Sequence, residues 1–255
     1  GNSLESARPV WEMVWERLPA TMVLAGVALV IWVGTAIALG VFAAVRRYSI
    51  YDQALTFLTY IMYSLPTFWL GLMLIFLFGP ALHLLPTGGV VNARDWPAFG
   101  SPQFWAAAGE RPFDAVWDIG RHPILPVLTL VVVNIAADSR FVRASMLETL
   151  SADFVRTARA KGLSARRVIG RHAFRNAMLP VTTNIALEIP FLVSGAVVVE
   201  TIFSWPGIGR LFITSVNERD YYVLMALIML TSFAILLANL IADVVYAIID
   251  PRIRY

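Results

Sequence analysis

The chain has 255 residues, of which 58% are apolar and only 15% charged, and its formal net charge is +3. A typical globular domain has about 45–50% apolar and about 25% charged residues, and the mean hydropathy here is +0.70. A soluble protein this poor in charge could not cover its own surface. The composition therefore argues against a soluble enzyme, a disordered tail and a nucleic-acid-binding module. The absence of cysteine excludes disulfides, thiolate metal sites and a cysteine nucleophile.

Five apolar runs follow one another along the chain, and a helix needs about 20 such residues to cross a membrane. The runs cover residues 18–45, 54–82, 123–137, 177–199 and 221–249. Pro66 interrupts the second run, and the third is expected to continue as a helix beyond the lipid to Leu147. The pattern predicts an all-α, polytopic membrane helix bundle with five spans.

Lys and Arg are shared unequally between the two sides of such a bundle, with thirteen on one side and seven on the other. Cytoplasmic loops carry the excess of positive charge, so residues 148–176 and the C-terminus are predicted to be inside. Residues 1–17, 83–122 and 204–220 are predicted to be outside. The stretch 87–120 is rich in Gly, Pro and Trp, which favours a folded loop of irregular structure.

Side chains suited to catalysis or metal binding are not gathered in the sequence. His83 and His122 fall in outer segments and His172 in an inner one, so the three cannot share a metal ion. The chain has no G-x-x-x-x-G-K-[ST] loop, no H-E-x-x-H and no G-x-S-x-G. We predict that this chain has no catalytic residue, no metal site and no cofactor of its own.

The inner segment 151–180 is more structured than a simple connection requires. Residues 153–161 are good helix formers, Gly162 suits a left-handed stop, and Ser164 is placed to cap a second short helix. Val155, Ala158 and Gly162 lie at i, i+3 and i+7 and predict a small-residue face that another protein could approach closely, opposite a basic face. Two interpretations remain open from spacing alone: a solvated basic loop resting on anionic lipid, or a docking element.

The run from Asp153 to Pro180 resembles the cytoplasmic loop of permease subunits of bacterial ABC importers, in their dipeptide/oligopeptide branch. Six further blocks are similar to that branch and occur in the same order, so the resemblance covers essentially the whole chain. They are residues 64–71 (SLPTFWLG), 85–89 (LPTGG), 122–129 (HPILPVLT), 140–147 (RFVRASML), 203–209 (FSWPGIG) and 250–252 (DPR).

The resemblance implies a type I ABC-importer permease fold over residues 18–255, with residues 1–17 as the end of an outer domain. It also implies six spans in the full-length subunit, one of which would precede this chain. The wider superfamily has Glu-Ala-Ala where this chain has Arg156, Thr157 and Ala158, which weakens any expectation of a salt bridge from that acid. By resemblance, the residues that couple the permease to its ATPase are Arg156, Ala158, Arg159, Lys161, Gly162, Leu163 and Arg166.

The resemblance further implies the partners and the substrate. The expected partners are a second, related permease, two cytoplasmic ATPase subunits that bind ATP and Mg, and an extracytoplasmic substrate-binding protein, all at the bacterial cytoplasmic membrane. The expected substrate is a di- or oligopeptide. Alternatives are nickel, glutathione or another solute carried by the same branch, an ion-coupled secondary carrier, and a membrane scaffold that binds lipid through its basic loop.

Polar residues within the apolar runs are the candidates for a translocation pathway. Glu188 lies near the middle of the fourth run, where a carboxylate is costly unless it is paired or in water. Asn184, Asn134 and the kink at Pro66 are the other candidates, although each also fits a structural role. Asp243 and Asn239 are expected to be structural.

The outer aromatic residues leave two interpretations open. The turn containing Trp205, Pro206 and Gly207 is a candidate outer gate or contact for a binding protein, and Trp205 and Phe203 equally suit an interfacial anchor. A second aromatic group fits either a docking surface or, as we favour, the core of a small folded loop. Its members are Trp96, Phe99, Phe104, Trp105 and Trp117.

Overall fold

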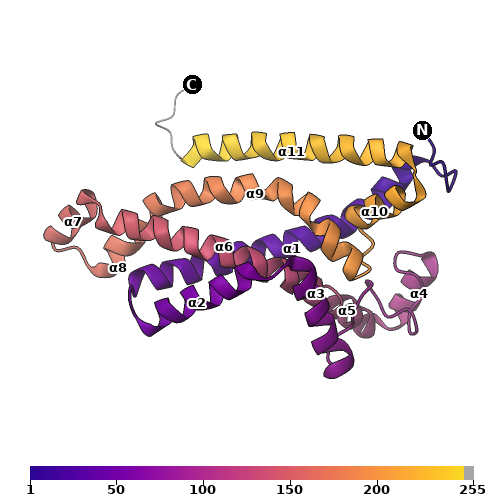
Figure 1. Ribbon diagram of the computed structural model, residues 1–255, viewed down its shortest axis with the longest axis horizontal. Helices are drawn as coiled ribbons and strands as arrows, with labels where there is room; N and C mark the ends of the chain where they lie inside the picture. The colour runs from indigo at the N-terminus through magenta and orange to yellow at the C-terminus, as the bar shows by residue number, and fades with distance from the viewer. Residues whose placement is uncertain (250–255) are drawn as a thin grey trace. The chain divides into compact units, whose positions relative to one another are not determined.

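A computed structural model describes residues 1–249, except for the side chains of residues 188–195, 241–243 and 245–249. Within this part the chain is helical, and its only β-pairing is an isolated bridge between Asn2 and Pro9 (Figure 1). The helices, in chain order, are α1 (Val10–Val45), α2 (Ile50–Ser64), α3 (Thr67–Phe76), the π-helical η1 (Leu77–Ala81), α4 (Pro102–Glu110), α5 (Pro112–Arg121), α6 (Ile124–Ser151), α7 (Asp153–Ala160), α8 (Ala165–Arg167), the π-helical η2 (Val168–Phe174), α9 (Arg175–Ile202), α10 (Ile208–Glu218) and α11 (Tyr221–Ile249).

The chain forms two compact units, and α1, α6, α9 and α11 each contribute residues to both. The first unit consists of Gly1–Ala28, Pro66–Val131 and Leu192–Ser232. The second unit consists of Leu29–Leu65, Val132–Phe191 and Phe233–Tyr255.

Among the described residues, three stretches are long and apolar enough to cross a membrane: Val10–Val45, Pro112–Ser151 and Tyr221–Leu240. The second predicted span is not one helix, because Leu65 and Pro66 have extended backbones with ψ of 125° and 135° and separate α2 from α3. A residue before proline is pushed out of the helical region, which accounts for the break. This bent pair adds one more span if it crosses as a unit. The fourth predicted run lies in α9. The side chains of residues 188–195 of this helix, Glu188 included, are outside the described part.

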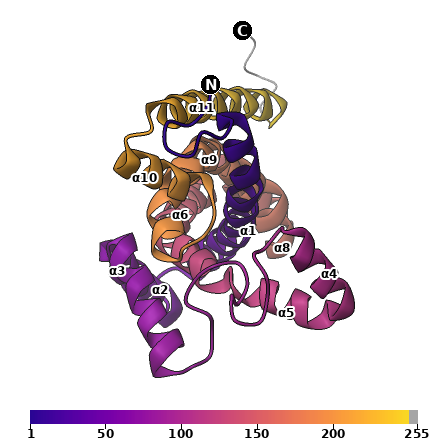
Figure 2. The same ribbon diagram turned by 90° about the vertical axis from the view of Figure 1, so that its right-hand side faces the viewer.

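The outer stretch 87–120 was expected to be irregular, and for its second half this is wrong. It contains α4 and α5, joined through Arg111 alone (Figure 2). Ser101 accepts a hydrogen bond from the Phe104 N–H (3.1 Å), and both helices begin with proline. Proline at the first helical position starts a helix rather than breaking one. Trp96 and Phe104 are buried with Ala115 in a small core, as expected for a folded loop. Trp105 and Trp117 are exposed and do not belong to that core.

The core of the second unit lies where several helices meet. Its buried members come from the end of α1, from α6, from α7 and from the η2–α9 segment: Ala44, Val142, Met146, Val155, Ala158, Val168, Ala173, Ala177 and Val181. The short helix α7 is thus part of the packed body, because its apolar face is buried there.

Candidate functional site

The segment after α6 has the helix–glycine–helix form that the sequence predicts. Helix α7 ends in a Schellman motif: Gly162 has φ +76°, its N–H donates to Arg159 O (2.9 Å), and the Leu163 N–H is directed at Ala158 O (3.4 Å). Only Ala152 separates α7 from α6. The glycine stop is therefore confirmed, and the loop is held in one shape by its own backbone.

The second half of the loop differs from the prediction in two ways. Helix α8 begins after Ser164, but the Ser164 side chain makes no cap hydrogen bond, and it is the backbone carbonyl that accepts from Val168 (3.0 Å). Helix α8 runs through η2 into α9 without a non-helical residue, so the predicted second short helix is the start of a long helical segment that also contains Pro180.

Two of the three members of the small-residue face, Val155 and Ala158, point into the protein, which corrects their assignment as contacts for a partner. Val155 is fully buried and Ala158 is only 6% exposed. Leu163, half-buried, packs against the same core. Apolar residues on one stripe of a short amphipathic helix bury against their own core when one is available. Ala158 is therefore a packing residue in this structure.

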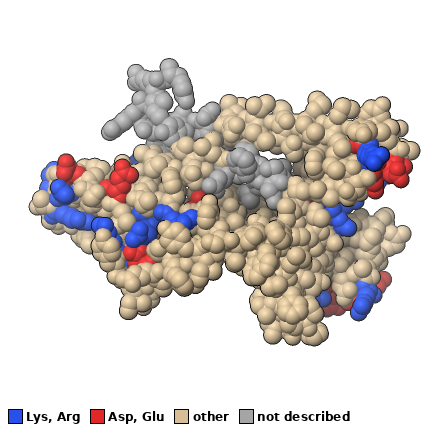
Figure 3. Space-filling view, viewed as in Figure 1, with Lys and Arg blue, Asp and Glu red and all other residues tan. Residues whose placement is uncertain are grey.

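The basic face of the loop is the exposed one. Arg156, Arg159, Lys161 and Arg166 are all exposed, as is Gly162. Figure 3 shows blue side chains gathered at the left of the view, where Figure 1 labels α7 and α8. The ion pair between Arg156 and Asp153 is 3.6 Å long and exposed on both sides, so it neutralises little of this charge.

A buried ion pair that the sequence analysis missed ties α2 to α6. Arg143 donates from Nε to Asp52 Oδ1 (2.6 Å) and from Nη2 to Asp52 Oδ2 (2.8 Å), and Asp52 is 2% exposed. The Tyr48 N–H also donates to Asp52 Oδ2 (2.9 Å). The two partners are 91 positions apart, and the only available signal was that Arg143 belongs to the block 140–147.

Arg140, from the same block, makes a second contact between α6 and α2. Its guanidinium lies 4.9 Å from the ring centre of Tyr60 and 4.6 Å from that of Tyr63. Such cation–π contacts add to the bidentate pair. Helix α6 is also joined to α9 by Ser145, whose Oγ donates to Ala177 O (2.7 Å). The loop is therefore attached to a body of several helices.

The pathway candidates are only partly brought together. Asn184 donates from Nδ2 to Asp138 Oδ1 (3.1 Å), and Asn134 lies one turn before Asp138 on α6. Pro66 belongs to the first unit and the two asparagines to the second. The side chain of Glu188 lies outside the described residues.

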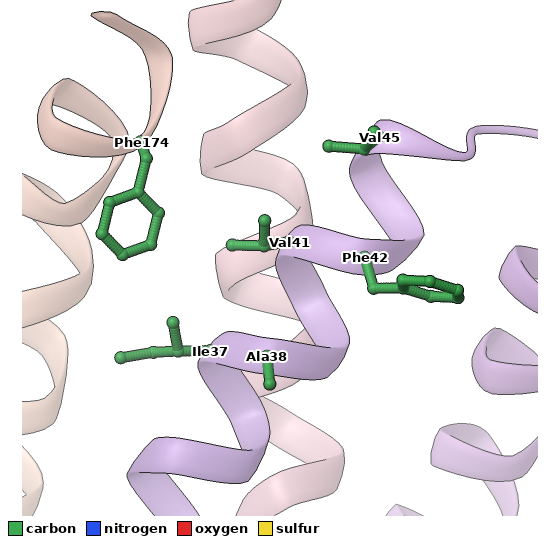
Figure 4. A pocket seen from close by; sticks show the side chains of 6 residues that line it. All are labelled: Ile37, Ala38, Val41, Phe42, Val45 and Phe174. Carbon is green, nitrogen blue, oxygen red and sulfur yellow. The ribbon is translucent and has the colours of Figure 1, made fainter. Parts of the chain in front are cut away.

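An apolar groove of about 370 Å³ opens beside the loop. It is lined by Ile37, Ala38, Val41, Phe42 and Val45 of α1 and by Phe174 of η2, and Figure 4 shows Ile37 and Val41 directed toward Phe174. Specific sites for polar solutes carry a few placed polar groups, and this lining has none. The groove is not suited to bind the charged ends of a peptide.

The outer turn after α9 is buried in the first unit, which corrects two expectations for it. Phe203 is fully buried, Trp205 is 3% exposed, and the Trp205 Nε1–H donates to Ala20 O (2.9 Å). Gly207 is buried and Pro206 half-buried. Trp205 is thus packed against α1 and Gly207 against Glu200, rather than presented to a binding protein or to lipid headgroups.

Glu200 organises this turn, and the sequence analysis did not identify it. Its carboxylate is fully buried, accepts from Thr21 Oγ1 (2.7 Å), and accepts from the Arg210 N–H (3.1 Å). Thr21 Oγ1 in turn accepts from the Ile208 N–H (2.8 Å). Together they satisfy N–H groups at the start of α10, which a helix leaves without intrahelical partners. A Cβ on Gly207 would overlap the Glu200 carboxylate.

Two sequence blocks that are far apart in the chain meet at this turn. The Gly89 N–H donates to Phe203 O (2.8 Å), and a Cβ on Gly88 would come within 2.7 Å of the same oxygen. The Phe203 ring lies 3.3 Å from the Cβ position of Gly71. The glycines of 64–71 and 85–89 thus allow the turn to pack closely.

A family model described as the binding-protein-dependent transport system inner membrane component matches residues 36–255. The chain belongs to this family. It is a permease, a transport component of an ABC importer rather than a catalytic subunit.

Curated relatives align over nearly the whole of this chain and about three quarters of their own length. The chain is 41% identical over 263 residues to the dipeptide transport system permease protein DppB of Escherichia coli (strain K12), covering 100% of this chain and 76% of that protein. It is 40% identical over 247 residues to the oligopeptide transport system permease protein AppB of Bacillus subtilis (strain 168), and the alignment covers 97% of this chain and 73% of that protein. It is also 40% identical over 255 residues to the glutathione transport system permease protein GsiC of Escherichia coli O1:K1 / APEC, covering 100% and 74%.

Solved structures share the permease fold at low sequence identity. A chain of the MetNI methionine ABC transporter in inward-facing conformations has a TM-score of 0.69 and 13% identity, covering 95% of this chain and 98% of that one. A chain of an amino acid ABC transporter crystallised with histidines has a TM-score of 0.59 and 13% identity, covering 92% and 94%. The predicted type I ABC-importer fold is confirmed.

Proposed function

We propose that this permease forms half of the pathway of an ATP-driven importer of di- or oligopeptides. The observation that carries the proposal is the similarity, at 40–41% identity over 97–100% of this chain, to permeases named for oligopeptide and dipeptide transport. The equal identity to a glutathione permease makes glutathione the second candidate. An ion-coupled carrier is not favoured, because the family works with binding proteins.

The exposed basic side of α7 and α8 is the proposed contact with the ATPase. Arg156, Arg159, Lys161 and Arg166 supply positive charge there, and exposed Gly162 permits close approach. Ala158 and Leu163 do not contact the ATPase in this scheme. They hold α7 in place by packing against the core of the second unit. A displacement of the loop by the ATPase is then transmitted to α6 and, through the Arg143–Asp52 pair, to α2.

The proposed assembly has two ATPase subunits, a second related permease and an extracytoplasmic binding protein. ATP and Mg belong to the ATPases, and this chain holds no cofactor. Residues 148–176 and the C-terminus lie in the cytoplasm in this scheme. The proposed pathway residues remain Asn134, Asn184, Glu188 and Pro66. In this scheme the buried turn at Trp205–Gly207 is a packed structural element at the outer end of the permease.

Uptake by the assembled complex in proteoliposomes tests the function. With ATP inside and the binding protein outside, we expect a labelled dipeptide to accumulate, and a proton or sodium gradient without ATP to give no uptake. Uptake driven by the gradient alone would contradict the importer. ATP-driven uptake of glutathione but of no dipeptide would retain the importer and replace the substrate. Native mass spectrometry of the same complex counts its subunits.

A further inference from the structure

Helix α5 has its apolar and polar faces reversed relative to an ordinary surface helix. Phe113, Val116 and Trp117, at i, i+3 and i+4, are 89%, 71% and 71% exposed. The opposite face carries Ala115 and Asp118, which are both buried. A helix on the surface of a soluble protein turns such an apolar stripe inward, so α5 requires an apolar neighbour outside the protein.

The polar face of α5 is held firmly, so the exposed aromatics cannot simply turn inward. Asp118 accepts from the Asn92 N–H (2.7 Å) and from Arg121 Nη2 (2.6 Å). Asp118 O is 2.6 Å from His122 Nδ1, and His122 is 2% exposed. Rotating α5 would break this buried network, which costs more than leaving three apolar side chains in contact with lipid.

The chain itself fixes where α5 lies relative to the membrane. Only His122 and Pro123 separate it from α6, which begins the third apolar run. Two residues reach at most about 10 Å between the flanking helix ends. The C-terminal end of α5, which carries Trp117, therefore lies near the outer boundary of the bilayer, and Phe113 is one helical turn further away. Aromatic residues and amphipathic helices concentrate in this zone.

We propose that α5 is an interfacial helix whose Phe113–Val116–Trp117 face is inserted among the lipids of the outer leaflet. It anchors the folded outer segment, through the Trp96–Phe104–Ala115 core, at a fixed depth beside the entrance of α6. The exposed Asp114 borders this face, but no charged side chain lies between its three members on the helix surface, which fits acyl chains better than a charged protein surface. This inference rests on membership of a membrane permease family and not on the identity of the substrate.

The absence of cysteine allows a direct test by spin labelling. Val116→Cys and, as a matched control, Gln103→Cys on the exposed polar side of α4 are labelled with a nitroxide in the assembled complex in lipid nanodiscs. We expect the ratio of oxygen to Ni-EDDA accessibility at position 116 to exceed that at 103 by at least about threefold, because oxygen partitions into the apolar zone that the face occupies.

Two results would overturn the proposal. Free collision of both labels with Ni-EDDA would place the face in water. Exclusion of both oxygen and Ni-EDDA at position 116 would show that a protein partner covers it. Both labelled positions are exposed, so the variants should fold, and thermal unfolding of each confirms this before the measurement.

Discussion

The buried Glu200 carboxylate on α9 bonds to Thr21 of α1 and to the start of α10. In Glu200→Ala, the Thr21 hydroxyl and the Arg210 N–H lose a buried partner. Each unsatisfied buried group costs about 1–3 kcal/mol, so for the two groups we expect a loss of about 2–6 kcal/mol in the free energy of unfolding. The Tm of the purified protein in detergent measures it. An unchanged Tm would show that the carboxylate is not buried as described.

Gly207 tests the same site by adding volume. A methyl group there would overlap the Glu200 carboxylate, and overpacking a buried site typically costs about 1–3 kcal/mol. Gly207→Ala should therefore lower the Tm. Gly26→Ala is the matched control, because nothing lies within 4 Å of its Cβ position and alanine favours a helix interior by up to about 1 kcal/mol. Equal behaviour of the two variants would contradict the packing of the turn.

The Arg143–Asp52 pair differs from the surface ion pairs in its burial. Arg143→Met leaves the Asp52 carboxylate buried without its cation, and we expect a loss of about 1–3 kcal/mol, reduced from the fully buried case because Arg143 is 27% exposed. A double-mutant cycle with Asp52→Asn measures the coupling. The exposed Arg8–Glu16 pair, tested in a matching cycle with Arg8→Met and Glu16→Gln, should show the smaller coupling. Equal coupling energies would show that the α2–α6 contact is superficial.

The end of α7 depends on a backbone conformation that only glycine adopts readily. Gly162 has φ +76° with nothing within 4 Å of its Cβ position, so Gly162→Leu strains the backbone by about 1–2 kcal/mol without a steric clash. We expect ATP-driven uptake to fall severalfold and the ATPase to co-purify less well. Gly170→Leu is the control, because this glycine is also exposed and uncrowded but has no positive φ. If both variants transported normally, the coupling assignment would fail.

Asp220 links the N-terminal segment to the start of α11. Burial alone raises the pKa of its carboxyl, but hydrogen bonds from Ser3 Oγ and from the N–H groups of Leu4 and Val223 hold the pKa below its usual value. A group with a lowered folded pKa stabilises the fold above its unfolded pKa, and this contribution is lost as the pH falls toward the folded pKa. The Tm of the wild type should therefore fall more steeply below about pH 5 than that of Asp220→Asn. Parallel Tm–pH curves would contradict this role.

Local patterns predicted several elements correctly and failed where packing decides. The α7 helix, the Gly162 stop and the extension of α6 past Leu147 follow from propensity and spacing. The inward face of α7 does not, because the same Val155–Ala158 stripe fits a foreign surface or the chain's own core equally well. Helices α4 and α5 do not follow from a composition rich in Gly, Pro and Trp, because proline is common in loops but occupies the first helical position in both.

At the scale of the whole molecule, the contacts that define the candidate site join residues distant in sequence. Thr21 and Glu200 are 179 positions apart, and Asp52 and Arg143 are 91 apart. No periodicity within a window of one helix reports such pairs. Resemblance located the blocks that contain Arg143 and the outer turn, but not their partners, because partners are set by how the helices pack. Burial of a charged side chain was the missing information in both cases.

The distribution of charge predicts how the whole chain is oriented, and the absence of cysteine makes this prediction measurable. Lys161 and Gln103 are both exposed and belong to segments predicted on opposite sides. In intact cells we expect Gln103→Cys to react with a membrane-impermeant maleimide and Lys161→Cys to react only after permeabilisation, because the positively charged flanks are retained inside. The cysteine-free parent controls for background labelling. The reverse pattern would place α7 outside, where no ATPase could reach it, and would overturn the coupling proposal together with the orientation.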